Sequence, residues 1–218
     1  MLNHIALFVI AVTFGIVGAI FGLNYWLVIS IIVGLTLLSI GYFLYTMFLS
    51  QNLKAIESVL HNNRKDPNYG YLVAVKDNHS EDAITQLDII INKVKISSQK
   101  HQYAIIREIL ANNYEAARTH AKEIEQSEVG KYSLALLDSM EGNGEEHLNT
   151  IFTKPWMSSA VRATHYFVKG DREQYEIHRD IALSLTKGLQ YAASVYTFRN
   201  LENNQGLNLI QTTVQPNQ

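Results

Sequence analysis

The sequence predicts an all-α protein in which a two-helix transmembrane hairpin precedes an α-solenoid of stacked helix pairs. Two observations predict this architecture: an uncharged apolar N-terminal segment, and a turn motif that recurs four times farther along the chain. Residues 1–50 contain no Asp, Glu, Lys or Arg, so all 18 basic and 20 acidic residues lie in residues 51–218. The chain therefore divides into a segment suited to lipid and a charged domain of ordinary size.

Two apolar runs, at about residues 5–23 and 26–49, form the predicted hairpin. At about 1.5 Å rise per residue, each run can cross a hydrocarbon core of roughly 30 Å, and backbone groups in lipid must bond within their own segment. Asn24 and Tyr25 alone separate the runs, so the turn is tight. Two buried core helices of a soluble fold are the alternative. A cleaved signal peptide fits poorly because no Lys or Arg precedes the first run.

Small residues recur at helical spacing in both runs and form the predicted packing surface of the hairpin. They are Gly15, Gly18 and Gly22 in the first run and Gly34 in the second. Gly18 and Gly22 form a GxxxG pair, which allows two helix backbones to approach closely in lipid. This surface packs either the two helices of one hairpin or two copies of the hairpin in a homo-oligomer.

The charges beside the apolar runs predict the orientation in the membrane. Lys54, Arg64 and Lys65 follow the second run closely, whereas the turn between the runs carries no charge. By the positive-inside rule, a cell-membrane protein with two spans is expected, with both termini and the soluble domain in the cytoplasm. Neither run contains a charged residue, which argues against an ion path through the hairpin.

Residues 51–66 are predicted to form a juxtamembrane helix and a linker. Apolar residues at helical spacing after residue 51 predict that the second membrane helix continues to about His61. A polar run before Pro67 then ends it, because proline disfavours helical backbone at the preceding residue.

Residues 67–203 are predicted to form the helical-repeat domain. Four turn-like segments each place a glutamate fourth, where an acid favours the start of a helix, and each follows an apolar helical segment. A helix pair of this size cannot bury its apolar face alone, so neighbouring pairs are expected to stack. Gly188 is expected to end one helix before a last helix over 188–203, and residues 204–218 are predicted to be a flexible tail. The four turns span residues 78–83, 112–117, 142–147 and 170–175, with Glu81, Glu115, Glu145 and Glu173 in fourth place.

This pattern resembles the tetratricopeptide repeat family over roughly residues 66–203. The similarity is strongest in HQYAIIREILANNYEAARTHAKEI (101–124) and KYSLALLDSMEGNGEEHL (131–148). The resemblance implies an α-solenoid whose concave face binds a partner. The spacing of the four glutamates shortens from 34 to 30 and 28 residues, and His147 and Tyr175 stand where the family has a small residue. An irregular helical bundle without a true repeat is the alternative.

The sequence contains no catalytic signature, so no enzyme, cofactor or metal is predicted. Cysteine is absent, which excludes disulfides and thiolate chemistry. His178-Arg179-Asp180 spells part of a kinase motif, but Leu185 replaces the required Asn. No two histidines are spaced i, i+4 on one expected helix, as in a common zinc motif. The net charge of −2 gives no general reason to expect nucleic acid.

Tyrosines and arginines on the first helix of each pair are the candidate partner-binding residues, because Tyr is common at interfaces and Arg binds carboxylates. They are Tyr103, Arg107, Tyr132, Arg162 and Tyr166. Packing between repeats is the alternative role for these tyrosines.

The predicted function is a membrane-tethered scaffold or adaptor that binds a protein partner, itself membrane-associated, at the cytoplasmic surface of the bilayer. By resemblance to other anchored tetratricopeptide proteins, a role in cell-envelope assembly is expected. Two alternatives stay open: an accessory subunit of a membrane enzyme or transporter, and a sensor of a cytoplasmic ligand or lipid.

Overall fold

The computed structural model describes residues 24–213 and, ahead of them, Thr13, Gly15, Gly18 and Gly22; side chains are described as far as residue 203. Every regular element in this part of the chain is a helix, which confirms the all-α prediction. The elements are α2 (Tyr25–Phe48), α3 (Leu53–Asn62), α4 (Pro67–Lys76), α5 (Ser80–Lys93), α6 (Ser97–Leu110), α7 (Tyr114–Glu123), α8 (Glu128–Met140), the 3₁₀ turn η1 (Gly144–His147), α9 (Pro155–Val168), α10 (Arg172–Ser184) and α11 (Gly188–Thr213).

The first predicted membrane helix, residues 5–23, lies outside the described residues apart from those four positions. The hairpin and the packing of its glycines therefore stay predictions. Gly34 lies within α2, the second apolar run.

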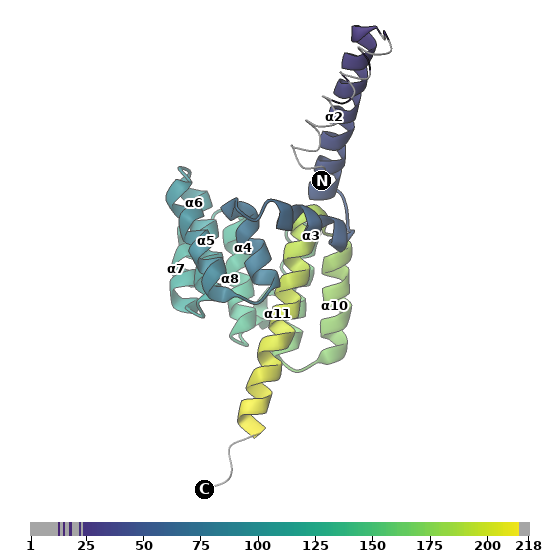
Figure 1. Cartoon of the computed structure of the whole chain (residues 1–218). Coiled ribbons are helices and arrows are strands. Elements are labelled where there is room, and N and C mark those ends of the chain that lie inside the picture. Colours follow the sequence, from purple (N-terminus) through teal and green to yellow (C-terminus); the bar gives the residue numbers. More distant parts are fainter. Residues whose placement is uncertain (1–12, 14, 16–17, 19–21, 23, 214–218) are drawn as a thin grey trace.

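Helix α2 is, among the described residues, the one helix long and apolar enough to cross a membrane. Its most apolar 18-residue window has a mean hydropathy of 2.4, and none of that window is buried inside the protein. Asn24 begins the helix, because its side-chain oxygen accepts a hydrogen bond from the Trp26 amide at 3.0 Å. Figure 1 shows α2 projecting away from the other helices. Such an uncovered apolar helix is suited to a lipid surrounding.

Helices α2 and α3 are separate, so the prediction of one continuous helix to about His61 is wrong. The Asn52 side chain accepts a hydrogen bond from the Ala55 amide at 3.2 Å and so starts a new helix. Ser50 Oγ accepts another from the Asn52 amide at 3.0 Å. Short polar side chains compete with helical hydrogen bonds in this way, and the chain turns steeply between the two helices (Figure 1).

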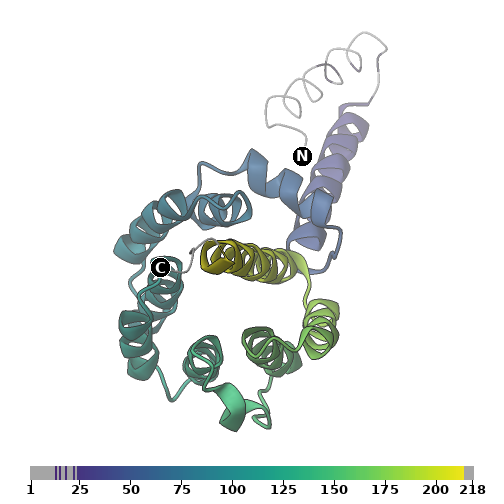
Figure 2. The ribbon, with the colours of Figure 1, turned by 90° about the horizontal axis from the view of Figure 1, so that it is seen from below.

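Helices α3 to α10 form a curved row in which each helix packs on the next. Figure 2 shows that this row surrounds α11. Helix α11 contacts α2, α3, α4 and α10. The chain's own last helix therefore occupies the inner side of the row, the side that the sequence assigned to a partner.

The four predicted turns share one backbone geometry. Each begins with a residue in the left-handed region, and the next amide bonds the carbonyl five residues earlier, as in a Schellman C-cap. Asparagine and glycine tolerate this conformation, which explains why they recur at these positions. The left-handed residues are Asn78, Asn112, Gly142 and Gly170, with φ of 58°, 56°, 83° and 78°.

The third turn departs from the pattern, because the expected helix after Glu145 is only the 3₁₀ turn η1. Two glycines within three residues favour a turn over a helix. Gly144 also lies against Ser139, where a Cβ would overlap the serine side chain. The chain then runs without regular structure to Pro155, which occupies the first position of α9.

Two clusters of buried side chains join α11 to the ends of the row. In the first, Ala192, Val195 and Tyr196 pack with residues of α2, α3 and α4. In the second, Phe198 packs with residues of α9 and α10. The predicted last helix therefore lies inside the curved row, and it continues past residue 203 to Thr213.

Candidate functional site

The junction between α2 and the row of helices is tightly built. Helix α10 ends at Ser184, and Gly188 begins α11, so the prediction that Gly188 ends the earlier helix is wrong. The Gly188 amide donates to the Ser50 carbonyl at 2.7 Å. A Cβ at Gly188 would overlap the Met47 carbonyl, and φ is +56° there. Glycine thus lets the start of α11 touch the end of α2.

Gln51 makes a second connection at this junction. Its side-chain nitrogen donates to three carbonyls at the C-terminal end of α10: Leu183 at 3.2 Å, Ser184 at 3.1 Å and Thr186 at 2.8 Å. The last carbonyls of a helix lack partners within it, so the bonds to Ser184 and Thr186 satisfy groups that otherwise need water. The segment after α2 is thereby fixed to α10.

The end of α2 also shares a hydrophobic core with the row. Met47 is 2 % exposed and belongs to the same cluster as Ile56, Leu60 and Tyr196. Tyr196 is almost fully buried, and its hydroxyl lies 3.3 Å from Glu57 of α3. Helix α2 is therefore held in a fixed direction relative to the other helices.

A cavity of about 340 Å³ lies beside this junction, between the first turns of α4 and α11 and the middle of α6. Leu189 and Gln190 on its wall directly follow Gly188. Burial, and then the nearby Tyr103, raise the pKa of Tyr71 to about 12, so its hydroxyl stays protonated at neutral pH. The wall consists of Asp66, Asn68, Tyr69, Tyr71, Leu72, Tyr103, Leu189, Gln190 and Ala193.

Of the predicted partner-binding residues, Tyr103 lines this cavity, and Arg107 follows one turn later on α6. Arg107 is already paired within the protein. Its Nε lies 3.2 Å from Asp88 and its Nη1 lies 2.6 Å from Glu108. The pair with Asp88 ties α6 to α5, the pair with Glu108 lies within α6, and both direct the guanidinium to carboxylates of the protein itself.

Arg162 and Tyr166 of α9 also make internal contacts. Arg162 Nε donates to the Leu148 carbonyl at 2.7 Å. Tyr166 stacks on His178 of α10, with ring centroids 5.5 Å apart and ring planes inclined by 7°. The structure brings this arginine and this tyrosine to the α9–α10 contact, on different elements from Tyr103.

Tyr132 of α8 is surrounded by aromatic side chains. It meets Phe152 and Trp156 edge-on, at centroid distances of 6.0 Å and 5.3 Å. Burial raises the pKa of its hydroxyl above the usual range. Tyr132 and Tyr166 border the same core cluster, so both contribute to packing between helices.

Two histidines, His165 of α9 and His178 of α10, have buried Nδ1 atoms without a hydrogen-bond partner in the described structure. Burial, then the charge of Lys169, lower the pKa of His165, which Glu145 partly opposes. Burial, then the charge of Arg162, lower the pKa of His178. Both rings are therefore neutral at physiological pH.

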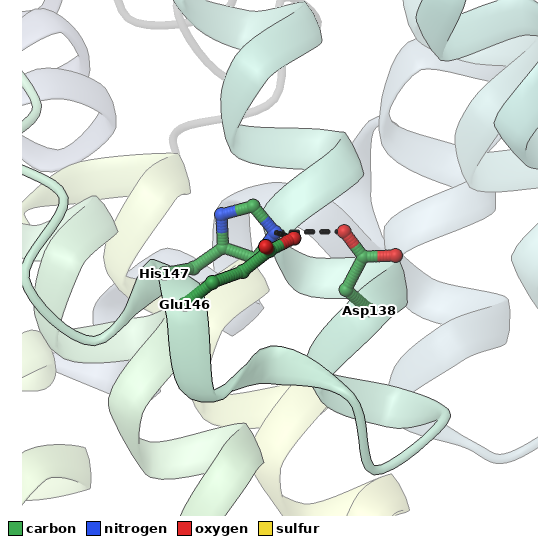
Figure 3. A group of neighbouring side chains, drawn as sticks. All are labelled: Asp138, Glu146 and His147. Atoms are coloured by element: carbon green, nitrogen blue, oxygen red, sulfur yellow. Dashed lines mark hydrogen bonds and ion pairs between the residues drawn. The ribbon is translucent and has the colours of Figure 1, made fainter.

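Asp138, Glu146 and His147 form a group whose ligand atoms lie within 4.8 Å of one another (Figure 3). His147 Nε2 lies 2.7 Å from Asp138 Oδ2, and Arg118 lies 2.7 Å from Asp138 Oδ1. Both carboxylate oxygens of Asp138 are thus engaged, and the guanidinium charge opposes a cation. The group is better suited to joining α7, α8 and η1 than to binding a metal.

Two arrangements had no signal in the sequence. The cavity combines α4, α6 and α11, which are distant along the chain. His101 and His120 are 19 residues apart, yet the packing of α6 on α7 brings their Nδ1 atoms to 3.2 Å. Neither arrangement has a fixed spacing on one helix, so both depend on tertiary packing.

The chain matches no protein-family model, no curated protein and no solved structure.

Proposed function

We propose that the protein is a membrane-tethered adaptor that holds a helical-repeat domain at the cytoplasmic surface of the cell membrane and binds a protein partner there. In this proposal residues 5–23 and 26–49 cross the membrane twice, and both termini are cytoplasmic. The row of helices acts as a tetratricopeptide-like α-solenoid. The partner is membrane-associated, and cell-envelope assembly is the proposed setting.

The observation that carries this proposal is the rigid junction between α2 and the helical domain. Met47 is buried in the domain core, the Gly188 amide bonds Ser50, and Gln51 bonds the end of α10. A flexible linker would leave the domain free to rotate at the membrane. A fixed domain presents one face to neighbours in the same bilayer, which lowers the entropy lost on binding and raises their effective concentration.

The membrane orientation can be tested with single cysteines, because the natural chain has none. We expect a membrane-impermeant maleimide added to intact cells to label Asn24→Cys in the turn. Asn3→Cys and Lys122→Cys should be labelled only after permeabilisation. Labelling of Asn3→Cys in intact cells would contradict two spans, and labelling of Lys122→Cys would contradict a cytoplasmic domain.

The adaptor role can be tested by crosslinking in intact cells and purification in mild detergent. Three proteins are compared: the full chain, a chain with residues 1–45 replaced by an unrelated hairpin, and residues 1–52 alone. The second version keeps Met47 in the core. We expect the first two to retain the same stoichiometric partner and the third to lose it. Copurification of the partner with residues 1–52 alone would contradict the proposal, and so would the absence of any stoichiometric partner.

The cavity beside the junction favours a second candidate, a sensor of a cytoplasmic ligand or lipid. Tyr71, Tyr103 and Gln190 line the cavity together with apolar side chains, and small-molecule sites combine the two kinds of side chain. Such a ligand would raise the melting temperature of the full-length protein, and Tyr103→Ala would abolish that rise. A ligand that stabilises both proteins equally would bind elsewhere.

A further inference from the structure

We propose that the outer face of α10 is a docking surface for a basic amphipathic helix of a membrane-anchored partner. The proposal rests on the proposed function, because it uses the membrane position of the domain to identify the partner's chemistry. The surface, called here the α10 face, consists of Ile177, Ile181 and Leu185 together with Glu173, Glu176 and Asp180.

The apolar part of the α10 face is a continuous stripe. Ile177, Ile181 and Leu185 are 44 %, 41 % and 47 % exposed. Their i, i+4, i+8 spacing places them on one side of the helix over about 12 Å. Isolated exposed apolar residues are common on protein surfaces, but a stripe at helical spacing has the form of a helix-binding surface.

The position of α10 explains why this stripe is uncovered. Each helix from α3 to α9 is followed by another helix of the row, whereas the chain after α10 turns inward to form α11. Helix α10 buries Tyr175 and Ala182 on its inner side. The outer side of the last helix in a stacked array is normally polar, because no repeat follows to cover it. Here it carries three large aliphatic side chains.

The charges beside the stripe select a basic partner. Glu173, Glu176 and Asp180 are exposed and lie along one edge of it. Arg172 pairs with Glu176 at 2.7 Å, and Arg179 pairs with Asp180 at 2.9 Å. Both arginines also reach Glu202 of α11, at 3.8 Å and 3.0 Å. The two guanidinium groups thus pair with three carboxylates, and with the exposed Glu173 these four acidic side chains outnumber the two arginines by two. A lysine-rich helix neutralises this excess negative charge, whereas a second copy of this chain brings more of the same sign.

The location of the stripe fits a juxtamembrane segment of the partner. Gln51, three residues after the end of α2, bonds the carbonyls of Leu183 and Ser184. Leu185 therefore lies at the membrane-proximal end of α10. Cytoplasmic segments next to membrane helices are rich in Lys and Arg. A helix that leaves the bilayer beside α2 would meet the α10 face directly.

The test uses a defined probe, a synthetic helical peptide of about 18 residues with a leucine stripe and lysines on its other faces. A matched peptide carries glutamate in place of lysine. Binding is measured by fluorescence anisotropy to the full-length protein in phosphatidylcholine nanodiscs, with empty nanodiscs as the blank. We expect the lysine peptide to bind, the glutamate peptide not to bind, and salt to weaken the complex.

Substitutions locate the binding on the protein. Ile181→Asn is expected to weaken peptide binding at least about tenfold, since it places an amide in the centre of the stripe. Ile106→Asn on α6 is the matched control, because Ile106 is 37 % exposed, and it should bind as the unmodified protein does. Combining Glu173→Gln, Glu176→Gln and Asp180→Asn should weaken binding and reduce its dependence on salt. Circular dichroism checks that each variant is folded.

Three results would overturn the α10 face as the docking site. These are equal binding of both peptides, equal binding by the Ile181→Asn protein, and a protein dimer in sedimentation that Ile181→Asn dissociates. The last would make a second copy the occupant. A cellular partner still retained by the Ile181→Asn protein removes this site but leaves the adaptor proposal intact. Selective peptide binding without any cellular partner contradicts the adaptor proposal alone.

Discussion

Helices α3 and α10, near the two ends of the curved row, both contact α11, whereas the described residues of α5 to α8 contact only the row itself. Both ends of the row share clusters of buried side chains with α11, which comes late in the sequence. The arc of α5 to α8 is stabilised by neighbouring helices and by local pairs such as Arg118–Asp138. Long-range packing thus fixes the side of the domain next to α2, and short-range packing fixes the arc. The two regions should respond differently to substitution.

The largest effect is expected at the junction itself. Gly188→Ala adds a Cβ that overlaps the Met47 backbone in a left-handed position, and the free energy of unfolding should fall by more than about 3 kcal/mol. Gly170→Ala is the control, since φ is +78° there and nothing lies within 4 Å of the place that an added Cβ would take. This change should lower the free energy of unfolding by about 1–2 kcal/mol. Urea denaturation of the two variants measures the difference. An equal loss of unfolding free energy in the two variants would show that the junction is loosely packed.

Truncating a core leucine should lower the free energy of unfolding by a similar amount in both regions, but hydrogen exchange should rise in different helices. Leu60→Ala in α3 and Leu137→Ala in α8 each remove a side chain that is at most 1 % exposed, at a cost of about 3 kcal/mol. Hydrogen exchange should rise in α3, α4 and α11 for the first variant. For the second it should rise in α6 to α8. One common pattern for both variants would mean that the domain opens only as a whole.

A smaller effect is expected where α10 meets α11. The buried Tyr175 hydroxyl donates to Glu202 at 2.7 Å, so Tyr175→Phe should lower the unfolding free energy by about 1–2 kcal/mol. Combining it with Glu202→Gln should cost less than the sum of the two single changes, because both remove the same bond. Additive losses in a double-mutant cycle would contradict a direct Tyr175–Glu202 interaction.

The smallest effect is a pH dependence of stability that arises from one buried histidine on α9 and one on α10. The folded-state pKa of His165 and of His178 is lowered, so the unfolded chain binds protons more readily. Their contribution to stability is full above about pH 6.5 and is lost as the pH falls through the folded-state pKa values. The urea midpoint should decline below that pH, and less steeply when both histidines are changed to Gln. An equally steep decline in the double variant would contradict this contribution.

Much of the helical architecture could be predicted from local sequence. The left-handed residues Asn78, Asn112, Gly142 and Gly170 stand at the four predicted turns, because a C-cap depends on a few consecutive residues. The missing helix after Glu145 and the break at Asn52 were not predicted. The acid in fourth place suggested a helix after Glu145, and apolar periodicity suggested a continuous helix through Asn52, while small and polar residues favoured a turn at both places.

The candidate site was less accessible to prediction. Helical spacing correctly placed Arg107 one turn after Tyr103, but it gave no sign that Asp88 and Glu108 occupy the guanidinium. Tyr69 and Tyr71, which line the cavity with Tyr103, showed no pattern that links them to Gln190 of α11. The α10 face has the spacing of an ordinary amphipathic helix, so only the structure reveals which of its apolar residues stay exposed.

The sequence by itself determined the division into an uncharged apolar segment and a charged helical domain, the helical class and the four turns. These properties depend on hydropathy and on backbone preferences within a few residues. Only the tertiary structure decided that α11 lies inside the curved row, that Gly188 meets Met47, and that the α10 face is uncovered. The physical reason is that hydrophobic packing has no direction. An apolar stripe predicts that one face of a helix will be buried. Which element covers that face depends on how all the helices pack together.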